Sequence, residues 1–320
     1  MKAAIYKKYG PPEVVSVSDI PKPVPSADEY LIRVYNSTVN RTESGFRSAE
    51  YVISRFWSGL LKPKYQVLGC EFAGIIESKG TETSGFEVGE AVFGYNDERF
   101  GGHAEYMVVK NTDAITKIPD GISFEMAAAI SEGAHYALTN IRASGIQKGQ
   151  TALVYGATGA IGSAAVQLLK YFGVRVVAVV NTQNVELVKN LGADVVIDYQ
   201  KEDFTKWNEK YHLVFDAVGK SSFGVCKPLL HEKGVYISTE LGKNGENVWR
   251  AILGKITGGK RILFPIPVTS KSDIEFLADR VADRSFLPVI DRIYDLDDIV
   301  EAYRYVETGQ KTGNVILKIR

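Results

Sequence analysis

The sequence predicts an α/β protein with two parts, a β-rich part built from short strands and a doubly wound parallel sheet. Strand and helix patterns alternate from residue 151 to residue 266, as they do in parallel βαβ folds. Short strand patterns separated by Gly and Pro turns fill residues 1 to 120, which indicates a small barrel. The length of 320 residues is sufficient for two domains.

The β-rich part begins with a strand pattern at residues 2–6. Tyr30 to Tyr35 alternates apolar and polar side chains, so we expect a half-buried strand there. Asn36 to Arg47 is polar, and we expect a loop or a short helix. Aromatic side chains between residues 46 and 65 either line an apolar pocket or pack a long loop. Further strands are expected at residues 67–77, 90–95 and 102–109.

Helix patterns appear from residue 119 onward. Ser123 is expected to cap one helix, and a second helix is expected from His135 to Ser144. The strands and helices that follow are expected at residues 151–155, 174–180, 185–190, 195–197, 213–218, 235–238, 247–256 and 262–266. The tail is mixed, with helices expected at 273–281 and 297–307 and strands at 289–293 and 314–319. We therefore expect that the tail can return to the first part.

The motif that carries most functional information is a glycine turn between two apolar runs, Thr151 to Tyr155 and Val174 to Val180. Strand, turn, helix and strand fit within the length of one βαβ unit. Glycines at this place let backbone N–H groups approach a pyrophosphate, and the helix N-terminus adds a favourable dipole. The spacing is GxxGxxG, where the usual dinucleotide fingerprint is GxGxxG. The candidate cofactor residues of the turn are Gly156, Thr158, Gly159, Ala160, Ile161 and Gly162.

Composition excludes several classes of protein. The formal net charge is zero, so the chain has no electrostatic footprint for nucleic acid or anionic membrane. No apolar run is long enough to span a bilayer, and the N-terminus lacks the apolar core of a signal peptide. Two cysteines do not make a disulfide framework. We therefore expect a reduced cytoplasmic protein that acts on a small molecule.

Several segments together resemble the zinc-free medium-chain dehydrogenases/reductases of the NADPH:quinone oxidoreductase group. The segments are MKAAIY at the start, LGCEFAGIIESKG at 68–80, FGGHAEYMVV at 100–109, GATGAIGSAAVQLLKYFG at 156–173, LGADVVIDY at 191–199, DAVG at 216–219 and GNVILKI at 313–319. The resemblance implies a GroES-like β-barrel domain formed by residues 1–120 and 270–320. It also implies a Rossmann domain at residues 121–269 and an active site between the two domains.

The resemblance also bears on zinc. Zinc enzymes of this superfamily bind catalytic zinc through Cys, His and Cys, and a structural zinc through four cysteines. Their GHE motif corresponds to Gly69-Cys70-Glu71 here, the first zinc cysteine corresponds to Asn40, and no cysteine lies near Ile130. One thiol and one carboxylate do not make a zinc site, so we expect no metal. Without a Lewis acid, alcohol oxidation is disfavoured, whereas quinones and α,β-unsaturated carbonyls accept hydride directly.

Asn40 is the candidate catalytic residue, because its amide could donate a hydrogen bond to the oxygen of the acceptor. The alternative role for Asn40 is to cap a turn.

Cofactor choice is read at the end of the second strand of the βαβ unit. NAD-preferring sites place Asp or Glu there, but this chain has Asn181 followed by Thr182. These residues can bond a 2′-phosphate, and Tyr199 matches a tyrosine that the family places near it. The lysine that quinone reductases often carry after the strand is absent. We expect NADPH, with NADH as the alternative, and Gly219 as a further cofactor residue or a turn glycine.

Two other functions and one assembly question stay open. The chain could be a non-catalytic NADPH-binding protein or a zinc alcohol dehydrogenase with atypical ligands. The apolar segment from Arg261 to Pro267 ends the parallel sheet and offers an unpaired edge. The resemblance implies homodimers through this edge, whereas Pro265 and Pro267 would block pairing if the tail masks it.

Overall fold

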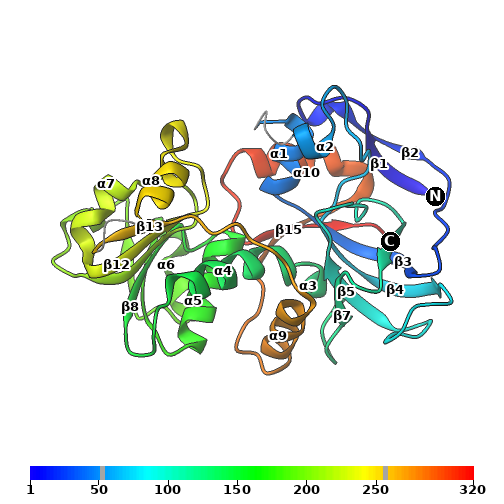
Figure 1. Cartoon of the computed structure of the whole chain (residues 1–320). Coiled ribbons are helices and arrows are strands. Elements are labelled where there is room, and N and C mark those ends of the chain that lie inside the picture. The colour runs from blue at the N-terminus through cyan, green and yellow to red at the C-terminus, as the bar shows by residue number, and fades with distance from the viewer. Residues whose placement is uncertain (51–54, 255–258) are drawn as a thin grey trace. The chain divides into compact units, whose positions relative to one another are not determined.

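The computed structural model describes residues 1–50, 55–254 and 259–320, and these form two compact units (Figure 1). The first unit is Met1–Glu132 with Thr269–Arg320, and the second is Gly133–Val268. The domain boundary expected after residue 120 stays a prediction. In the structure, the following segment up to Glu132 belongs to the first unit, because its helix packs against the strands of that unit.

The second unit is built on a six-stranded parallel sheet. The strand order β10-β9-β8-β11-β12-β13 is that of a Rossmann fold, which confirms the doubly wound sheet. Its central strands are buried over nearly their whole length, as expected for strands covered on both faces. The strands are β8 (Thr151–Tyr155), β9 (Arg175–Val180), β10 (Val195–Asp198), β11 (Tyr211–Asp216), β12 (Leu230–Ser238) and β13 (Arg261–Leu263).

Helices alternate with these strands along the chain. They are α4 (Ser131–Ser144), α5 (Ala160–Tyr171), α6 (Val185–Asn190), α7 (Phe223–Cys226) and α8 (Glu246–Gly254). Helix α4 begins before the expected His135, and the expected end of α8 at Ile256 lies outside the described residues. Strand β13 ends at Leu263, short of the expected Ile266, because Pro265 has no N–H to continue a ladder.

The first unit is built on a seven-stranded mixed sheet. Its order is β14-β15-β3-β4-β5-β7, and β6 also pairs with β3. These strands are β3 (Glu29–Val39), β4 (Glu71–Lys79), β5 (Ala91–Tyr95), β6 (Tyr106–Lys110), β7 (Ala114–Lys117), β14 (Ile290–Asp295) and β15 (Asn314–Lys318). A separate antiparallel pair joins β1 (Lys2–Tyr6) to β2 (Val15–Asp19).

The C-terminal tail completes the first unit, as expected. Strand β15 pairs antiparallel with β3, with Val315 opposite Val39, and β14 pairs parallel with β15. Figure 1 shows the red C-terminal strand against the blue β3. The helices of this unit are α1 (Arg41–Ser48), α2 (Arg55–Ser58), α3 (Phe124–Ala128), α9 (Lys271–Ala282) and α10 (Ile299–Glu307).

The segment from Asn36 to Arg47 contains the expected short helix, but its first residues are a strand. Its first part continues β3 to Val39, and its second part is α1, of eight residues. Asn40 begins this helix with a capping box: its side chain accepts from the backbone N–H of Thr42 and Glu43, and the Glu43 side chain accepts from the Asn40 N–H. The capping box thus fixes the side chains of Asn40 and Glu43 at the junction between the buried end of β3 and helix α1.

None of the helices in the described ranges is long and apolar enough to cross a membrane.

Candidate active site

The parallel sheet brings the predicted cofactor residues to one edge. In the register of the sheet, Tyr155 lies opposite Val179 on one side and Asp216 on the other, and Asp198 lies opposite Val180. The carboxyl ends of β8, β9, β10 and β11 are therefore adjacent. Gly156–Gly162, Asn181, Thr182, Tyr199 and Gly219 all follow these ends, where dinucleotides bind in open parallel sheets. Their binding roles stay predictions.

The glycine turn is held tightly at its first and last glycines and is open in the middle. Gly156 has a φ of +78°, a conformation that favours glycine. A Cβ on Gly162 would lie 2.1 Å from the Gly156 oxygen, so the helix packs directly on the turn. Gly159 begins α5 with no side-chain cap, and a Cβ there would meet no atom within 4 Å. The N-terminus of α5 therefore faces open space that fits an anion.

Asp216 organises the neighbouring turn that contains Gly219. The buried Asp216 carboxylate accepts from the backbone N–H of Val218 at 3.2 Å and of Ser221 at 2.8 Å, and from the Tyr236 hydroxyl at 3.1 Å. Gly219 has a φ of +64°, so it is required as a turn glycine whether or not it also contacts a cofactor.

The residues after β9 have a carboxylate neighbour that the sequence did not reveal. The Asp198 carboxylate, at the end of β10, accepts the Thr182 hydroxyl at 2.6 Å, and Lys201 pairs with it at 3.2 Å. This hydrogen bond, followed by smaller contributions that include Lys201, holds the pKa of Asp198 below its ordinary value. Neither Asn181 nor Thr182 carries a carboxylate, but the fold brings the Asp198 carboxylate to Thr182. Lys201, two residues after the half-exposed Tyr199, supplies a cation that compensates the Asp198 charge.

Asn40 is buried, and the capping role that the sequence left open is present in the structure. Its Oδ1 is used by the helix cap. Its Nδ2 donates to a Glu132 carboxylate oxygen and makes a long 3.4 Å bond to the Thr38 hydroxyl. The second hydrogen is thus weakly held, so the predicted donation to a substrate oxygen stays a chemically available role.

Asn40 belongs to a buried polar network that joins three glutamates. Thr42 Oγ1 donates to Glu132 at 2.5 Å, and Thr38 Oγ1 donates to Glu71 at 2.6 Å. The Glu132 backbone N–H donates to Glu71 at 2.6 Å. Glu71 and Glu43 are fully buried, and Glu132 is 7% exposed.

Burial dominates the electrostatics of this network. It raises the pKa of Glu71 to about 7 and raises the pKa of Glu132 well above its ordinary value, to which the charges of Glu43 and Glu71 add. It also raises the pKa of Glu43 and lowers that of the nearby Lys311 ammonium. The carboxyls therefore favour their neutral forms more than surface carboxyls do.

Three buried side chains near the positions that correspond to a catalytic zinc site could be considered as metal ligands. Glu43, Cys70 and Glu132 bring one ligand-type atom each to within 4.8 Å of one another. Both Glu43 oxygens already accept backbone N–H groups, from Asn40 at 3.0 Å and from Cys70 at 2.9 Å. Burial and the nearby carboxylates raise the pKa of the Cys70 thiol well above its ordinary value, which opposes the thiolate that zinc requires. These residues fit a hydrogen-bonded cluster better than a zinc site.

His103 is a structural histidine. Its Nε2 lies 2.7 Å from the Thr38 carbonyl oxygen, to which it donates, and burial lowers its pKa to about 4. A neutral His103 thus supports the strand that carries Thr38 toward Asn40.

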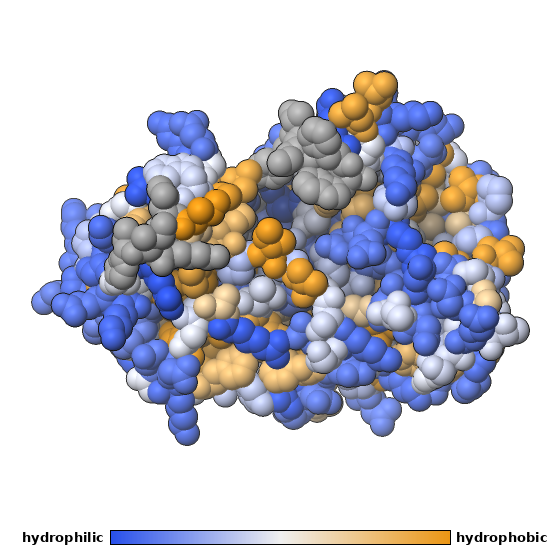
Figure 2. Space-filling model, in the orientation of Figure 1, coloured by the Kyte–Doolittle hydropathy of each residue, from blue (hydrophilic) through white to orange (hydrophobic). Residues whose placement is uncertain are grey.

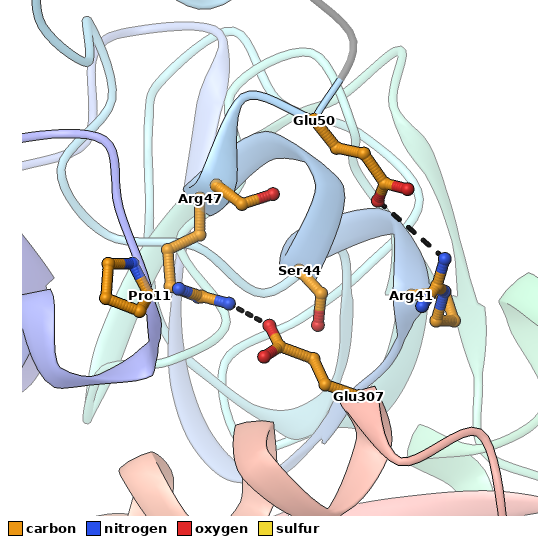
Figure 3. Close-up of a pocket in the computed structure, with 7 residues that line it drawn as sticks. Pro11, Arg41, Ser44, Arg47, Glu50 and Glu307 are labelled. Carbon is orange, nitrogen blue, oxygen red and sulfur yellow. Dashed lines mark hydrogen bonds and ion pairs between the residues drawn. The ribbon is translucent and has the colours of Figure 1, made fainter.

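A cavity of about 390 Å³ runs along α1 in the first unit. Figure 3 shows two ion pairs at its wall, Arg47 with Glu307 and Arg41 with Glu50, the second at 3.7 Å. Because these charges are paired, the cavity wall offers no strong attraction for a charged ligand.

A second cavity, of about 200 Å³, is lined in part by Tyr65 and Phe100. Phe46 packs edge-on against Phe100, with ring centroids 5.1 Å apart. Of the aromatic side chains between residues 46 and 65, Tyr65 thus lines a cavity and Phe46 packs against Phe100. Tyr51 and the side chains of Phe56 and Trp57 lie outside the described residues.

Comparisons with known proteins agree with this architecture. A family model for the alcohol dehydrogenase GroES-like domain matches residues 26–120, and a model for zinc-binding dehydrogenases matches residues 191–317. The chain is 30% identical over 330 residues to a 2-methylene-furan-3-one reductase of Solanum lycopersicum, covering 99% of this chain and 79% of the relative. It is 29% identical to an NADPH-dependent alkenal/one oxidoreductase of Arabidopsis thaliana, with the same coverage.

A solved structure, the quinone oxidoreductase from Coxiella burnetii, shares the fold with a TM-score of 0.88. It is 24% identical and is covered over 99% of its length, against 100% of this chain. Together the matches define a reductase-type chain with a GroES-like and a Rossmann part. The chain belongs to the medium-chain dehydrogenase/reductase family, in its quinone oxidoreductase-like group.

Proposed function

We propose that this protein reduces quinones or α,β-unsaturated carbonyl compounds with NADPH, by direct hydride transfer and without zinc. The observation that supports it most is the open N-terminus of α5 at the carboxyl edge of a Rossmann sheet, with Gly159 facing free space. The names of two relatives, an enone-type reductase and an NADPH-dependent alkenal/one oxidoreductase, point to the same chemistry.

The glycine turn binds the pyrophosphate through backbone N–H groups. Asn181, Thr182 and Tyr199 bind the phosphorylated ribose, with Lys201 adding positive charge. When bound, NADPH supplies the hydride. Asn40 donates its second amide hydrogen to the acceptor oxygen, on which negative charge develops.

This acceptor class follows from the chemistry of the first unit. Alcohol oxidation needs a cation that stabilises an alkoxide, and the Glu43, Cys70 and Glu132 cluster already uses its oxygens in hydrogen bonds. An enone or a quinone spreads the incoming negative charge onto an oxygen, for which a neutral amide donor is sufficient.

Metal analysis tests the zinc-free reaction. We expect less than stoichiometric zinc in the purified protein and the same NADPH-dependent reductase rate before and after dialysis against a chelator. One zinc per chain, with a rate that falls on chelation and returns with zinc, would favour a zinc alcohol dehydrogenase with atypical ligands instead. Tight NADPH binding with no turnover of any acceptor would favour the non-catalytic alternative.

Assembly and location complete the proposal. We propose a cytoplasmic homodimer that pairs through the outer edge of β13, which is the last strand of the sheet. Exposed apolar side chains support an interface on this unit, and Figure 2 shows orange surface near α8 and the segment after β13. The exposed apolar side chains of α8 and of the segment after β13 include Trp249, Ile252, Ile266 and Val268. Two free buried cysteines are consistent with a reducing compartment.

A further inference from the structure

Three buried carboxyl groups meet in the first unit with a single lysine facing them. Glu43 comes from α1, Glu71 from the start of β4 and Glu132 from the start of α4. Lys311, from the loop before β15, is the cation that acts on all three. Three ionised carboxylates against one ammonium would bury two uncompensated charges, each costing several kcal/mol. The cluster therefore retains at least one proton at neutral pH.

The hydrogen bonds indicate which carboxyl holds that proton. Glu43 accepts two backbone N–H groups, and Glu71 accepts the backbone N–H of Glu132 besides the Thr38 hydroxyl. Backbone N–H groups only donate, so they favour the anionic forms of Glu43 and Glu71. Glu132 accepts one obligate side-chain donor, the Asn40 amide, and one hydroxyl, that of Thr42. A hydroxyl can donate or accept, so a protonated Glu132 keeps its bond to Thr42 by reversing its direction. Burial raises the pKa of both Glu71 and Glu132, but backbone N–H groups of Ser131 and Glu132 lower that of Glu71. The charges of Glu43 and Glu71 instead both raise the pKa of Glu132, so the proton favours Glu132.

We propose that Glu132 stores the proton that completes the reduction and delivers it through the hydroxyl of Thr42. This inference rests on the proposed function. Thr42 Oγ1 lies 2.5 Å from Glu132, its side chain is only partly buried, and it follows Asn40, the predicted binder of the acceptor oxygen, by two residues. Glu132 itself is nearly inaccessible, so Thr42 is the group at the surface of this unit.

The step balances with the hydride. Hydride addition brings two electrons and converts an enone to its enolate, or a quinone to the hydroquinone anion. The Thr42 hydroxyl then gives its proton to this anion and takes the Glu132 proton, so that a neutral product and a Glu132 carboxylate remain. Water returns the proton to Glu132 before the next turnover. The net reaction is acceptor, NADPH and one proton giving reduced acceptor and NADP⁺.

The charged surroundings support recharging of Glu132 between turnovers. Burial raises the pKa of Glu132, the charges of Glu43 and Glu71 add to this effect, and the Thr42 hydrogen bond and the Lys311 ammonium oppose it. The charge of Asp291 also acts on Lys311, and that of Asp97 acts on Cys70. Re-protonation is therefore favoured at neutral pH.

An infrared measurement tests the proton store without any turnover. The difference spectrum of wild type minus Glu132→Gln at pH 7 is recorded on cofactor-free protein. We expect the carbonyl band of a protonated carboxyl in the wild type that is absent in the variant. Bands of an ionised carboxylate at that position would overturn the proposal. Glu132→Gln keeps an oxygen for Asn40 and an amide for Thr42, so equal melting temperatures would verify that the fold is retained.

Turnover tests the delivery path. Thr42→Val removes the hydroxyl at equal volume, and we expect kcat to fall at least tenfold with an unchanged Kd for NADPH. Thr42→Ser should restore most of that rate, because the hydroxyl returns. Glu132→Gln should lower kcat similarly and abolish the fall in rate that the wild type shows as rising pH ionises Glu132. Glu77→Gln, a charge change in a surface ion pair of the same unit, is the matched control and should leave kcat unchanged.

The outcomes separate this inference from the function on which it rests. A Thr42→Val protein with wild-type kcat and the wild-type solvent deuterium isotope effect would overturn delivery through Thr42. A wild type that reduces no acceptor would contradict the proposed function and the delivery role together, while the infrared result would still decide whether Glu132 holds a proton.

Discussion

Asn181 is the residue where cofactor choice is most open to a single change. It directly follows β9, and its Oδ1 accepts a hydrogen bond from the Asn184 amide at 2.7 Å. Its neighbour Thr182 bonds Asp198, so the local charge is set by the Asp198–Lys201 pair. A second carboxylate at position 181 would leave that pair with an excess of negative charge.

Asn181→Asp should therefore move the preference from NADPH toward NADH. The new carboxylate would repel the 2′-phosphate, and NADPH efficiency should fall about tenfold for each 1.4 kcal/mol of repulsion. With NADH it would accept hydrogen bonds from the free ribose hydroxyls, so NADH efficiency should hold or rise. The measurement is kcat/KM for both cofactors. Asn208→Asp, on an exposed loop of the same unit, is the control for the charge change alone. An unmoved ratio in Asn181→Asp would show that residue 181 does not face the ribose.

Glu71 makes a prediction for stability. Its pKa is about 7 in the folded chain against 4.5 ordinarily, so the folded state binds the extra proton between these values. The stabilisation of the folded state by this proton is fully present below about pH 4.5. It is lost as the pH rises to 7, which lowers the free energy of unfolding by about 3 kcal/mol. The free energy of unfolding of the wild type should fall over this window relative to Glu71→Gln.

Denaturant titrations at several pH values measure this difference. The buried neutral His103, with a pKa of about 4, stabilises the folded state less as the pH falls from 6.5. This opposite effect is common to both proteins and cancels in the comparison. Glu77→Gln, a partly exposed carboxyl, should retain the wild-type profile. Parallel pH profiles for wild type and Glu71→Gln would mean that Glu71 titrates normally.

At the scale of elements, the glycine turn before α5 is the part most open to a test. Gly159 has a φ of −68° and a ψ of 172°, which valine also adopts, and its Cβ position is free. Gly159→Val should therefore fold while placing a branched side chain where the pyrophosphate binds. We expect NADPH affinity to fall about a hundredfold or more, which corresponds to about 2.7 kcal/mol.

Titration of NADPH fluorescence with the variant measures this affinity. Gly45→Val is the matched control, because the Cβ position of Gly45 in α1 is also free and lies in the other unit. An unchanged NADPH affinity in folded Gly159→Val would place the cofactor elsewhere.

Elements with a strong apolar period could be predicted from the sequence, whereas the bounds of α1 could not. The βαβ pattern marked the Rossmann strands because their burial on both faces makes them continuously apolar. Helix α1 instead buries the polar side chains of Glu43, Ser44 and Arg47, so no apolar period announces it. Its only local signal is the Asn40–Glu43 capping box, which the sequence contains as N-x-x-E.

At the scale of the molecule, the carboxyl cluster was beyond prediction because its members are far apart in the chain. Glu43, Glu71, Glu132 and Lys311 come together only through the pairing of β3 with β4 and β15 and the start of α4. That the predicted cofactor residues gather at one edge of the sheet could be predicted, because a parallel sheet places successive carboxyl ends side by side. Asp198 was missed there because its role depends on pairing of β10 with β9.

The proposed dimer is a property of the whole molecule. The described part of β13 is a short edge strand followed by prolines, and a partner strand must pair within Arg261–Leu263. Sedimentation at micromolar concentration should give twice the chain mass of 35.2 kDa. Ile262→Pro removes a backbone N–H from the middle of β13 and disfavours strand pairing, so this variant should sediment as a monomer if β13 pairs across the two-fold axis. A wild-type monomer would contradict the dimer.

The central claim is NADPH-dependent reduction of a quinone or an enone, and a side-by-side acceptor screen tests it most directly. The initial rate of cofactor oxidation is measured with NADPH and with NADH against a panel of quinones, enals, enones and simple ketones. We expect oxidation of NADPH with a quinone or an α,β-unsaturated carbonyl compound, a lower kcat/KM with NADH, and no turnover of simple ketones. Reduction of simple ketones alone, or no oxidation of NADPH by any acceptor, would contradict the account.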